Sequence, residues 1–266
     1  MIDVINIMPK DYLYKFYLTN DISTSMHMAM AHLILEDNDY SKWSKKQREL
    51  GKYIILDNSS PYFGGALGND SLLGCINKIN PNEVVLPDIV GNFEETIRRS
   101  LEFINQINIE DLKIMAVPQG DSLEEYTECY NLFSSDKRID VIGLSYTVDN
   151  LFSDKIIPLN YINSREYLIS LLYKNNIINP NKEHHLLGFN NSGHIELEKL
   201  NMFSFIRSCD SSTAYATAKQ NIEINNNVHY KKPKISIDFD DNFEKGNYEL
   251  VVKNTKTLAK AGGYRK

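Results

Sequence analysis

Six short apolar runs in this sequence each end at a polar side chain or at a glycine. The residues at these ends are, in order, Asp57, Asp88, Gln119, Gly143, Gly188 and Asp210. A carboxylate that follows a buried strand can act as a nucleophile, a general base or a metal ligand. It can also simply cap the next helix, since Asp is a preferred N-cap residue. Because the pattern recurs along the chain, it favours a shared site at one edge of a sheet.

The elements that must position these residues are short strands alternating with helices. Apolar and aromatic runs predict strands at residues 12–18, 53–56, 83–86, 112–117, 139–144, 185–189, 202–208 and 235–239. Helical spacing of apolar residues predicts helices at residues 71–79, 93–107, 122–133, 164–173, 193–200 and 211–220. Residues 25–35 are predicted to form a helix or a buried segment.

This alternation predicts βαβ units and a parallel sheet, whose functional groups lie at the carboxyl ends of the strands. A length of 266 residues suits a single α/β barrel. We therefore predict a (β/α)8 TIM-type barrel, regular or distorted, with a short basic C-terminal extension. Residues 1–218 are the barrel core with its catalytic face, and residues 219–266 are the extension, which could also complete the barrel. An open doubly wound sheet is the alternative.

The charge of the chain is unevenly distributed. The whole sequence has a net charge of −6, but residues 219–266 contain ten Lys and Arg against six Asp and Glu, so this segment is +4 and the remainder −10. A basic segment on an acidic body can bind a phosphate backbone. We predict nucleic-acid contacts from Lys231, Lys232, Lys234 and Arg207, with an ordinary solvated surface as the alternative.

Some classes of protein are disfavoured by features that the sequence lacks. No apolar stretch approaches the roughly 20 residues that cross a bilayer, and no signal peptide is recognisable. The three cysteines are widely spaced and form no metal-ligand pattern, which predicts a reducing, cytoplasmic setting. The glycine motifs of nucleotide sites and the H-E-x-x-H motif do not occur, so we predict no metal, no cofactor and no membrane partner.

The ordered strand-end motifs resemble those of the tRNA-guanine transglycosylase superfamily. The residues that carry the resemblance are Leu56-Asp57-Asn58-Ser59-Ser60, Leu86-Pro87-Asp88, Val117-Pro118-Gln119-Gly120, Ile142-Gly143-Leu144, His185-Leu186-Leu187-Gly188 and Cys209-Asp210-Ser211-Ser212. The likeness covers roughly residues 14–215 and is greatest to the phage-encoded branch that inserts 7-deazaguanines into DNA.

The resemblance implies a role for each matching residue. It makes Asp210 the covalent nucleophile and Asp57 the general base or proton shuttle. The residues that it assigns to recognition of the base are Asp88, Gln119, Gly143, Leu144, Asn58, Tyr62 and Leu187. Tyr62, or its neighbour Phe63, would stack on the ring of the base.

The sequence also departs from the family's pattern. Asn58-Ser59-Ser60 stands where the family has Ser-Gly-Gly, and Pro61 displaces the stacking aromatic residue. Met202-Phe203 precedes Ser204 instead of the nucleophile, so Asp210 lies further along the chain. The zinc site of the tRNA enzymes is absent, which favours another polynucleotide, or no catalysis.

The activity that the resemblance implies is replacement of guanine in DNA by a free 7-deazaguanine, such as a cyano- or amido-substituted base. The setting would be the cytoplasm, or the host cytoplasm for a phage-encoded protein. One carboxylate would trap the cation-like sugar as an ester, as in retaining glycosidases, and a second would handle the protons of the base. Exchange on tRNA and a non-catalytic nucleic-acid-binding subunit are the alternatives. His184 and His185 begin a predicted strand and are interpreted as structural.

Overall fold

The computed structural model describes residues 1–19, 25–59, 67–154, 156–225, 232–233 and 235–264. Its strands form an eight-stranded sheet in the order β1-β8-β7-β6-β5-β4-β3-β2, and helices alternate with the strands along the chain. This order follows the sequence around the sheet without the reversal that defines a doubly wound fold. The predicted (β/α)8 TIM-type barrel is therefore confirmed.

The strands are short, as is usual for this fold. Their bounds are β1 Asp3–Asn6, β2 Met26–Met30, β3 Tyr53–Asp57, β4 Glu83–Val85, β5 Lys113–Ala116, β6 Val141–Ser145, β7 Glu183–Leu187 and β8 Ile206–Ser211. Most residues of these strands are buried, because helices or barrel interior cover both faces of a parallel sheet.

The helices and the single described 3-10 turn connect these strands. Their bounds are α1 Lys10–Thr19, α2 Ala31–Glu36, α3 Asn38–Glu49, α5 Asn69–Ile79, α6 Phe93–Ile104, α7 Leu123–Ser135, η1 Asp149–Phe152, α8 Ser164–Lys174, α9 His194–Leu200, α10 Thr213–Lys219 and α11 Lys245–Ala261.

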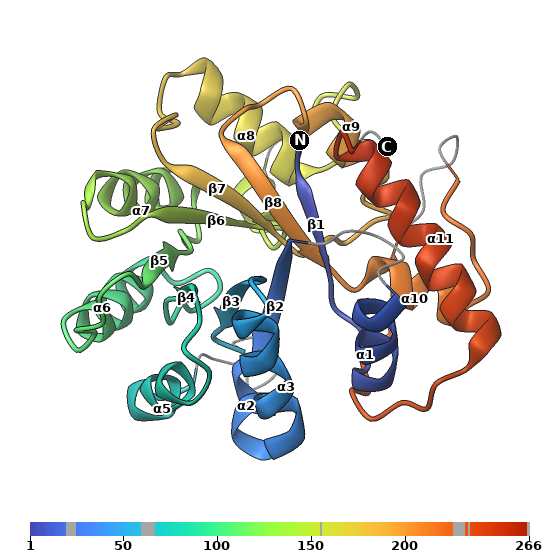
Figure 1. Ribbon diagram of the computed structural model, residues 1–266. Coiled ribbons are helices and arrows are strands. Elements are labelled where there is room, and N and C mark those ends of the chain that lie inside the picture. Colours follow the sequence, from blue (N-terminus) through green and yellow to red (C-terminus); the bar gives the residue numbers. More distant parts are fainter. Residues whose placement is uncertain (20–24, 60–66, 155, 226–231, 234, 265–266) are drawn as a thin grey trace. The chain divides into compact units, whose positions relative to one another are not determined.

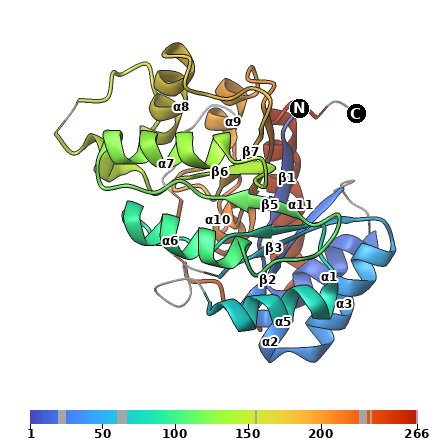
Figure 2. The ribbon, with the colours of Figure 1, turned by 90° about the vertical axis from the view of Figure 1, so that its left-hand side faces the viewer.

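The chain divides into two compact units, and the larger one, unit 2, comprises His27–His184. Within it β3, β4, β5 and β6 pair in parallel, with Leu56 opposite Val84 and Val84 opposite Ile114. Helices α6 and α7 lie side by side outside these strands (Figure 2). Parallel pairing in this register brings the carboxyl ends of β3, β4 and β5 to the same edge of the sheet.

Unit 1 comprises Met1–Met26 and His185–Lys266. Its strands β1 and β8 pair in parallel, with Ile5 opposite Asp210. Helix α11 packs against β1, α9 and α10, as Figure 1 shows, and Ile2 N donates to Gly262 O at 2.7 Å. Residues 219–266 were predicted to form a C-terminal extension. They contain helix α11, which packs on β1, the first strand of the same unit.

Two predicted elements differ from the structure. Residues 12–18 form helix α1 instead of a strand, because Tyr12, Leu13 and Phe16 share one helical face and all three are buried there. Residues 235–239, predicted as a strand, form none. The sequence patterns also missed β1 and α11, which are too short and too polar, respectively, to show a clear apolar period.

Within the described residues, no helix combines the length and the apolar composition that a membrane crossing requires.

His27 in β2 makes the stability of the fold depend on pH. Its side chain is buried, with its ring centroid 5.0 Å from that of Trp43 and 6.3 Å from that of Tyr40. Burial lowers the pKa of His27 from 6.5 to about 3, because the charged imidazolium is poorly solvated there. The folded state therefore takes up this proton later than the unfolded state as the pH falls.

We expect His27→Phe to remove this dependence. The contribution of His27 is fully present above pH 6.5 and is lost as the pH falls toward 3, with a slope of up to about 1.4 kcal/mol per pH unit. Urea denaturation at pH 7.5, 6, 5 and 4 should show the variant gaining stability over the parent at each step downward. If the two proteins differ in free energy of unfolding by the same amount at every pH, the lowered pKa of His27 is contradicted.

Candidate functional site

Among the helices that the structure describes, none has Asp57, Asp88 or Asp210 as its N-cap. The N-cap of α5 is Gly68 and that of α6 is Asn92, whose side chain accepts from Glu95 N at 3.0 Å. The N-cap of α10 is Ser212. The capping alternative therefore does not apply to Asp57, Asp88 or Asp210 at these three described helices.

In unit 2, Asp88 lies at the centre of a hydrogen-bonded cluster with Asn58 and Gln119. Asn58 Nδ2 donates to Asp88 Oδ1 at 2.8 Å, and Gln119 Nε2 donates to Asp88 Oδ2 at 2.7 Å. All three side chains are buried. Three residues that follow three adjacent strands, β3, β4 and β5, thus meet as predicted, and we call them the Asp88 cluster.

The orientation of both amides in the Asp88 cluster is fixed by backbone groups. Asn58 Nδ2 also donates to Leu86 O at 2.6 Å, so the amide nitrogen of Asn58 must face Asp88. Gln119 Oε1 accepts from Gly91 N at 3.2 Å, which turns the amide nitrogen of Gln119 toward Asp88. Asp88 therefore receives N–H donors on both oxygens and acts as an acceptor.

Burial raises the pKa of Asp88, while the hydrogen bonds from Asn58 and Gln119 oppose this shift. Ionising this carboxylate therefore costs more free energy than ionising an exposed one. A ligand that brings further N–H donors to Asp88 would favour its ionised form. A carboxylate can accept about four hydrogen bonds, and the amide nitrogen of Gln119 carries two hydrogens. The cluster can consequently bind a planar group that presents N–H donors beside an acceptor.

Gly120 explains how Gln119 reaches this position. A Cβ atom added at Gly120 would lie 2.5 Å from Tyr126 N, in the first turn of α7. Only glycine lets the chain pass this close to the helix. Asn150 Nδ2 then donates to Gly120 O at 3.2 Å, which anchors the turn from the other side.

Asp57 is the last residue of β3 and is held by a tight turn. Its Oδ2 atom accepts from Ser59 N at 2.8 Å, and Ser59 has a left-handed backbone with φ 60°. Ser59 Oγ accepts from His32 N at 3.2 Å and lies 2.9 Å from His32 Nδ1. Burial lowers the pKa of His32, and Glu36 partly offsets this. A neutral His32 therefore fixes the strained turn that orients Asp57.

The other residues predicted to recognise the base in unit 2 are not part of the Asp88 cluster. Gly143 and Leu144 are buried within β6, and Leu144 O accepts from Arg165 Nη1 at 3.1 Å. Arg165 thus binds the backbone of Leu144, one of the residues predicted to recognise the base. Tyr62 and Phe63 lie outside the described residues, so their stacking role stays a prediction.

In unit 1, Asp210 lies near the end of β8 with its two oxygens in different environments. Asp210 Oδ1 accepts from Gly188 N at 3.1 Å and lies 3.2 Å from His185 Nε2. Asp210 Oδ2 takes no hydrogen bond from any residue that the structure describes. The side chain of Asp210 is 14% exposed. One oxygen is therefore fixed while the other is available to an approaching ligand.

Gly188 can donate to Asp210 because its backbone is left-handed, with φ 61°. This conformation is strained for residues with a Cβ atom. Leu187, the residue before it, ends β7 and is half-buried, and its contact with a base stays a prediction.

Of the four residues predicted to contact nucleic acid, the structure describes Lys232 and Arg207. Lys231 and Lys234 lie outside the described residues. Lys232 is half-buried, and its backbone N donates to Asn190 O at 3.1 Å. Burial lowers the pKa of Lys232, and the negative charge of Asp210 raises it. Lys232 and Asp210 therefore interact electrostatically. Arg207 is a half-buried residue of β8. Because successive side chains of a strand point to opposite faces, Arg207 lies on the face opposite Ser208 and Asp210.

The two adjacent histidines of β7 have different surroundings. His184 Nε2 lies 2.9 Å from Tyr130 Oη and its Nδ1 lies 2.9 Å from Lys182 O, which suits the structural role predicted for it. His185 instead contacts Asp210. The sequence interpretation missed this contact, although the alternation of β7 places His185 and Leu187 on one face.

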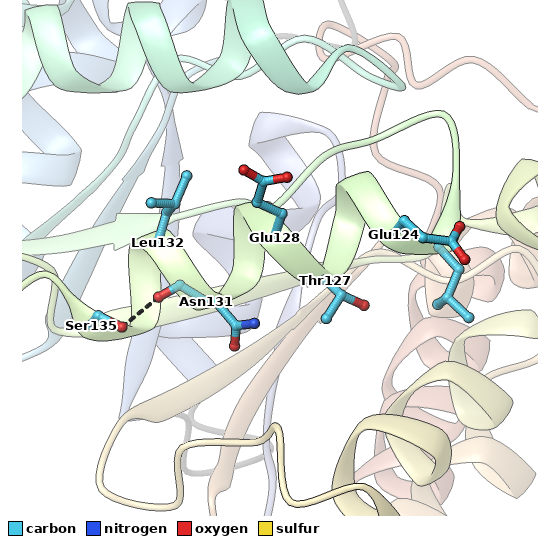
Figure 3. A pocket seen from close by; sticks show the side chains of 7 residues that line it. Glu124, Thr127, Glu128, Asn131, Leu132 and Ser135 are labelled. Carbon is cyan, nitrogen blue, oxygen red and sulfur yellow. Dashed lines mark hydrogen bonds between the residues drawn. The ribbon is translucent and has the colours of Figure 1, made fainter.

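A shallow surface groove lies along the outer face of α7, away from these residues (Figure 3). Its lining residues are Leu123, Glu124, Thr127, Glu128, Asn131, Leu132 and Ser135. All of them belong to one helix, and none is a predicted site residue. Among the described residues, no three His, Cys, Asp or Glu side chains gather as a metal ion would require.

No protein-family model matches this sequence, and no curated protein matches it significantly. Solved structures of the same fold do match. Tryptophan synthase from M. tuberculosis superposes with a TM-score of 0.55 at 8% identity, covering 100% of this chain and 93% of that one. The YdjI aldolase from Escherichia coli K12 gives a TM-score of 0.55 at 11% identity, covering 98% and 91%. Both are enzymes, and at these identities the likeness shows the fold alone.

The raised pKa of Asp88 leads to a stability prediction. The folded state holds this proton to a higher pH than the unfolded state, so the contribution of Asp88 is lost as the pH rises above 3.8 and through the folded pKa. We expect Asp88→Asn to gain stability relative to the parent as the pH rises from 4 to 8. The control Asp111→Asn changes an exposed carboxylate whose left-handed backbone suits Asn. Denaturation curves in which both variants track the parent equally would contradict the assignment.

Proposed function

We propose that this protein is an enzyme that exchanges guanine in DNA for a free 7-deazaguanine. The observation that carries the proposal is the Asp88 cluster, a buried carboxylate fixed between two oriented amides at adjacent strand ends. The edge of a guanine-like ring offers N1–H and an exocyclic amine beside the O6 acceptor. Asp88 accepts from the two donors, and the second amide hydrogen of Gln119 reaches O6.

The chemistry of exchange assigns the sugar to Asp210. Its Oδ2 attacks C1′, the bond from C1′ to N9 of guanine breaks, and the electron pair leaves with the purine, which takes up a proton. The incoming 7-deazaguanine then loses its N9 proton and attacks C1′, and the ester bond to Asp210 breaks. Two inversions retain the configuration at the sugar. Asp57 carries the proton between the leaving and incoming bases.

DNA is the proposed polymer because the sequence lacks the zinc site of the tRNA enzymes. The target base must leave the helix before it can reach a buried cluster. Incubation of the protein with labelled guanine and either duplex DNA, single-stranded DNA or tRNA tests this choice. Label in DNA supports the proposal, label in tRNA alone replaces the polymer, and label in none of them overturns the activity.

A competition experiment tests the Asp88 cluster separately. Unlabelled 7-cyano-7-deazaguanine should bind the protein and quench incorporation of labelled guanine. Adenine, which presents an acceptor at N1 in place of the N1–H donor, should do neither. Equal binding of the two bases by isothermal titration calorimetry would remove the role assigned to Asp88.

We expect Asp210→Asn to abolish exchange, with a loss of roughly 10⁴-fold or more. The amide keeps the shape of the carboxylate but is not a nucleophile, so folding and polymer binding should persist. Wild type should form a denaturant-resistant adduct with DNA in the absence of an incoming base, and Asp210→Asn should not. The matched variant Asp57→Asn should still form the adduct but resolve it slowly. An adduct in Asp210→Asn would place the nucleophile elsewhere.

A further inference from the structure

The contacts of His185 exceed those that a strand residue needs for packing. Its ring is fully buried, with Nε2 3.2 Å from Asp210 Oδ1 and Nδ1 2.8 Å from Ser208 Oγ. Ser208 and Asp210 are two residues apart in β8 and so face the same side of the strand. His185 in β7 thus bridges two polar side chains of the neighbouring strand.

The partners of the ring determine where its proton lies. A carboxylate offers only acceptors, so His185 Nε2 must carry a hydrogen to bond Asp210. Ser208 can donate its hydroxyl hydrogen to Nδ1, which completes a chain from Ser208 through His185 to Asp210. Gly188 N donates to the same oxygen of Asp210. Both donors therefore converge on Oδ1, and their directions fix the rotation of the carboxylate.

We propose that His185 is a positioning residue for Asp210, holding Oδ1 so that Oδ2 is the oxygen that forms and releases the bond to the substrate carbon. This inference rests on the proposed function, in which Asp210 is the nucleophile. It reverses the arrangement of a serine hydrolase, where the aspartate orients the histidine. Here the imidazole orients the carboxylate.

The hydrogen bond from His185 affects the two halves of the reaction unequally. A hydrogen bond to a charged oxygen is stronger than one to a neutral oxygen. When the ester forms at Oδ2, Oδ1 becomes a neutral carbonyl oxygen. When the ester breaks, the negative charge returns to the carboxylate and the His185 bond strengthens. His185 therefore assists departure of Asp210 from the sugar, and its loss should make the covalent intermediate persist.

Lys232 acts on the same carboxylate by a different route. Its backbone is anchored to Asn190 O and its half-buried amine interacts electrostatically with Asp210. A point charge stabilises the carboxylate without fixing its rotation. Lys232→Met therefore serves as a comparison that lowers the charge stabilisation of Asp210 while leaving the hydrogen bonds to Oδ1 intact.

The kinetic experiment compares His185→Phe and His185→Gln with wild type. His185→Phe should lower kcat by about 100-fold, the loss expected for a misplaced reacting group. It should also raise the fraction of enzyme trapped as the DNA adduct during turnover. His185→Gln keeps an N–H donor and should restore both quantities to within about tenfold of wild type. A loss of kcat in both variants without adduct accumulation would overturn the inference and leave His185 a packing residue.

A second measurement does not depend on activity. In protein with ¹⁵N-labelled histidine, NMR should show His185 protonated at Nε2 and unprotonated at Nδ1, with the assignment made from His185→Gln. Ser208→Ala and Asp210→Asn should each shift these signals. A His185 ring protonated at Nδ1 alone would overturn the positioning role. If the predicted tautomer is found but no polymer accepts label, the proposed reaction fails while the contact stands.

Discussion

Within each unit, the arrangement of the candidate site residues depends on one constraint, the parallel pairing of short strands. Parallel neighbours send their carboxyl ends to the same edge, so residues that follow them are brought together regardless of their separation in sequence. In unit 2 this joins Asn58, Asp88 and Gln119, which follow β3, β4 and β5. In unit 1 the same principle places Asp210 of β8 beside Gly188, which follows β7. Loops alone would not hold these groups within hydrogen-bonding distance.

Burial then gives each carboxylate its character. Asp88 is buried and its pKa is raised, because burial disfavours the charged form of the carboxylate. Asp210 is partly exposed and has one oxygen fixed by Gly188 and His185, which suits the nucleophile role proposed for it. The two carboxylates are thus differentiated by their surroundings although both follow a buried strand.

The proposed function and the fold are supported by different kinds of observation. The fold is shown by the strand order and by the likeness to tryptophan synthase and to an aldolase, two enzymes that share the architecture. One barrel fold supports many reactions, so that likeness selects none of them. Base exchange is proposed from the Asp88 cluster and from the resemblance of the strand-end motifs to those of the transglycosylases. Lys232, for which a nucleic-acid contact is predicted, also interacts electrostatically with Asp210.

The sequence by itself determined the barrel class and the residues of the Asp88 cluster, because strand ends and turn residues are local signals. It misassigned residues 12–18, since an aromatic run satisfies the strand pattern and the helix pattern equally until the core selects one face. It also could not show that His185 contacts Asp210. That contact joins residues 25 positions apart through the pairing of two strands, and only the tertiary structure sets their register. The same holds for the fixed amide orientations, which depend on the carbonyl of Leu86 and the N–H of Gly91.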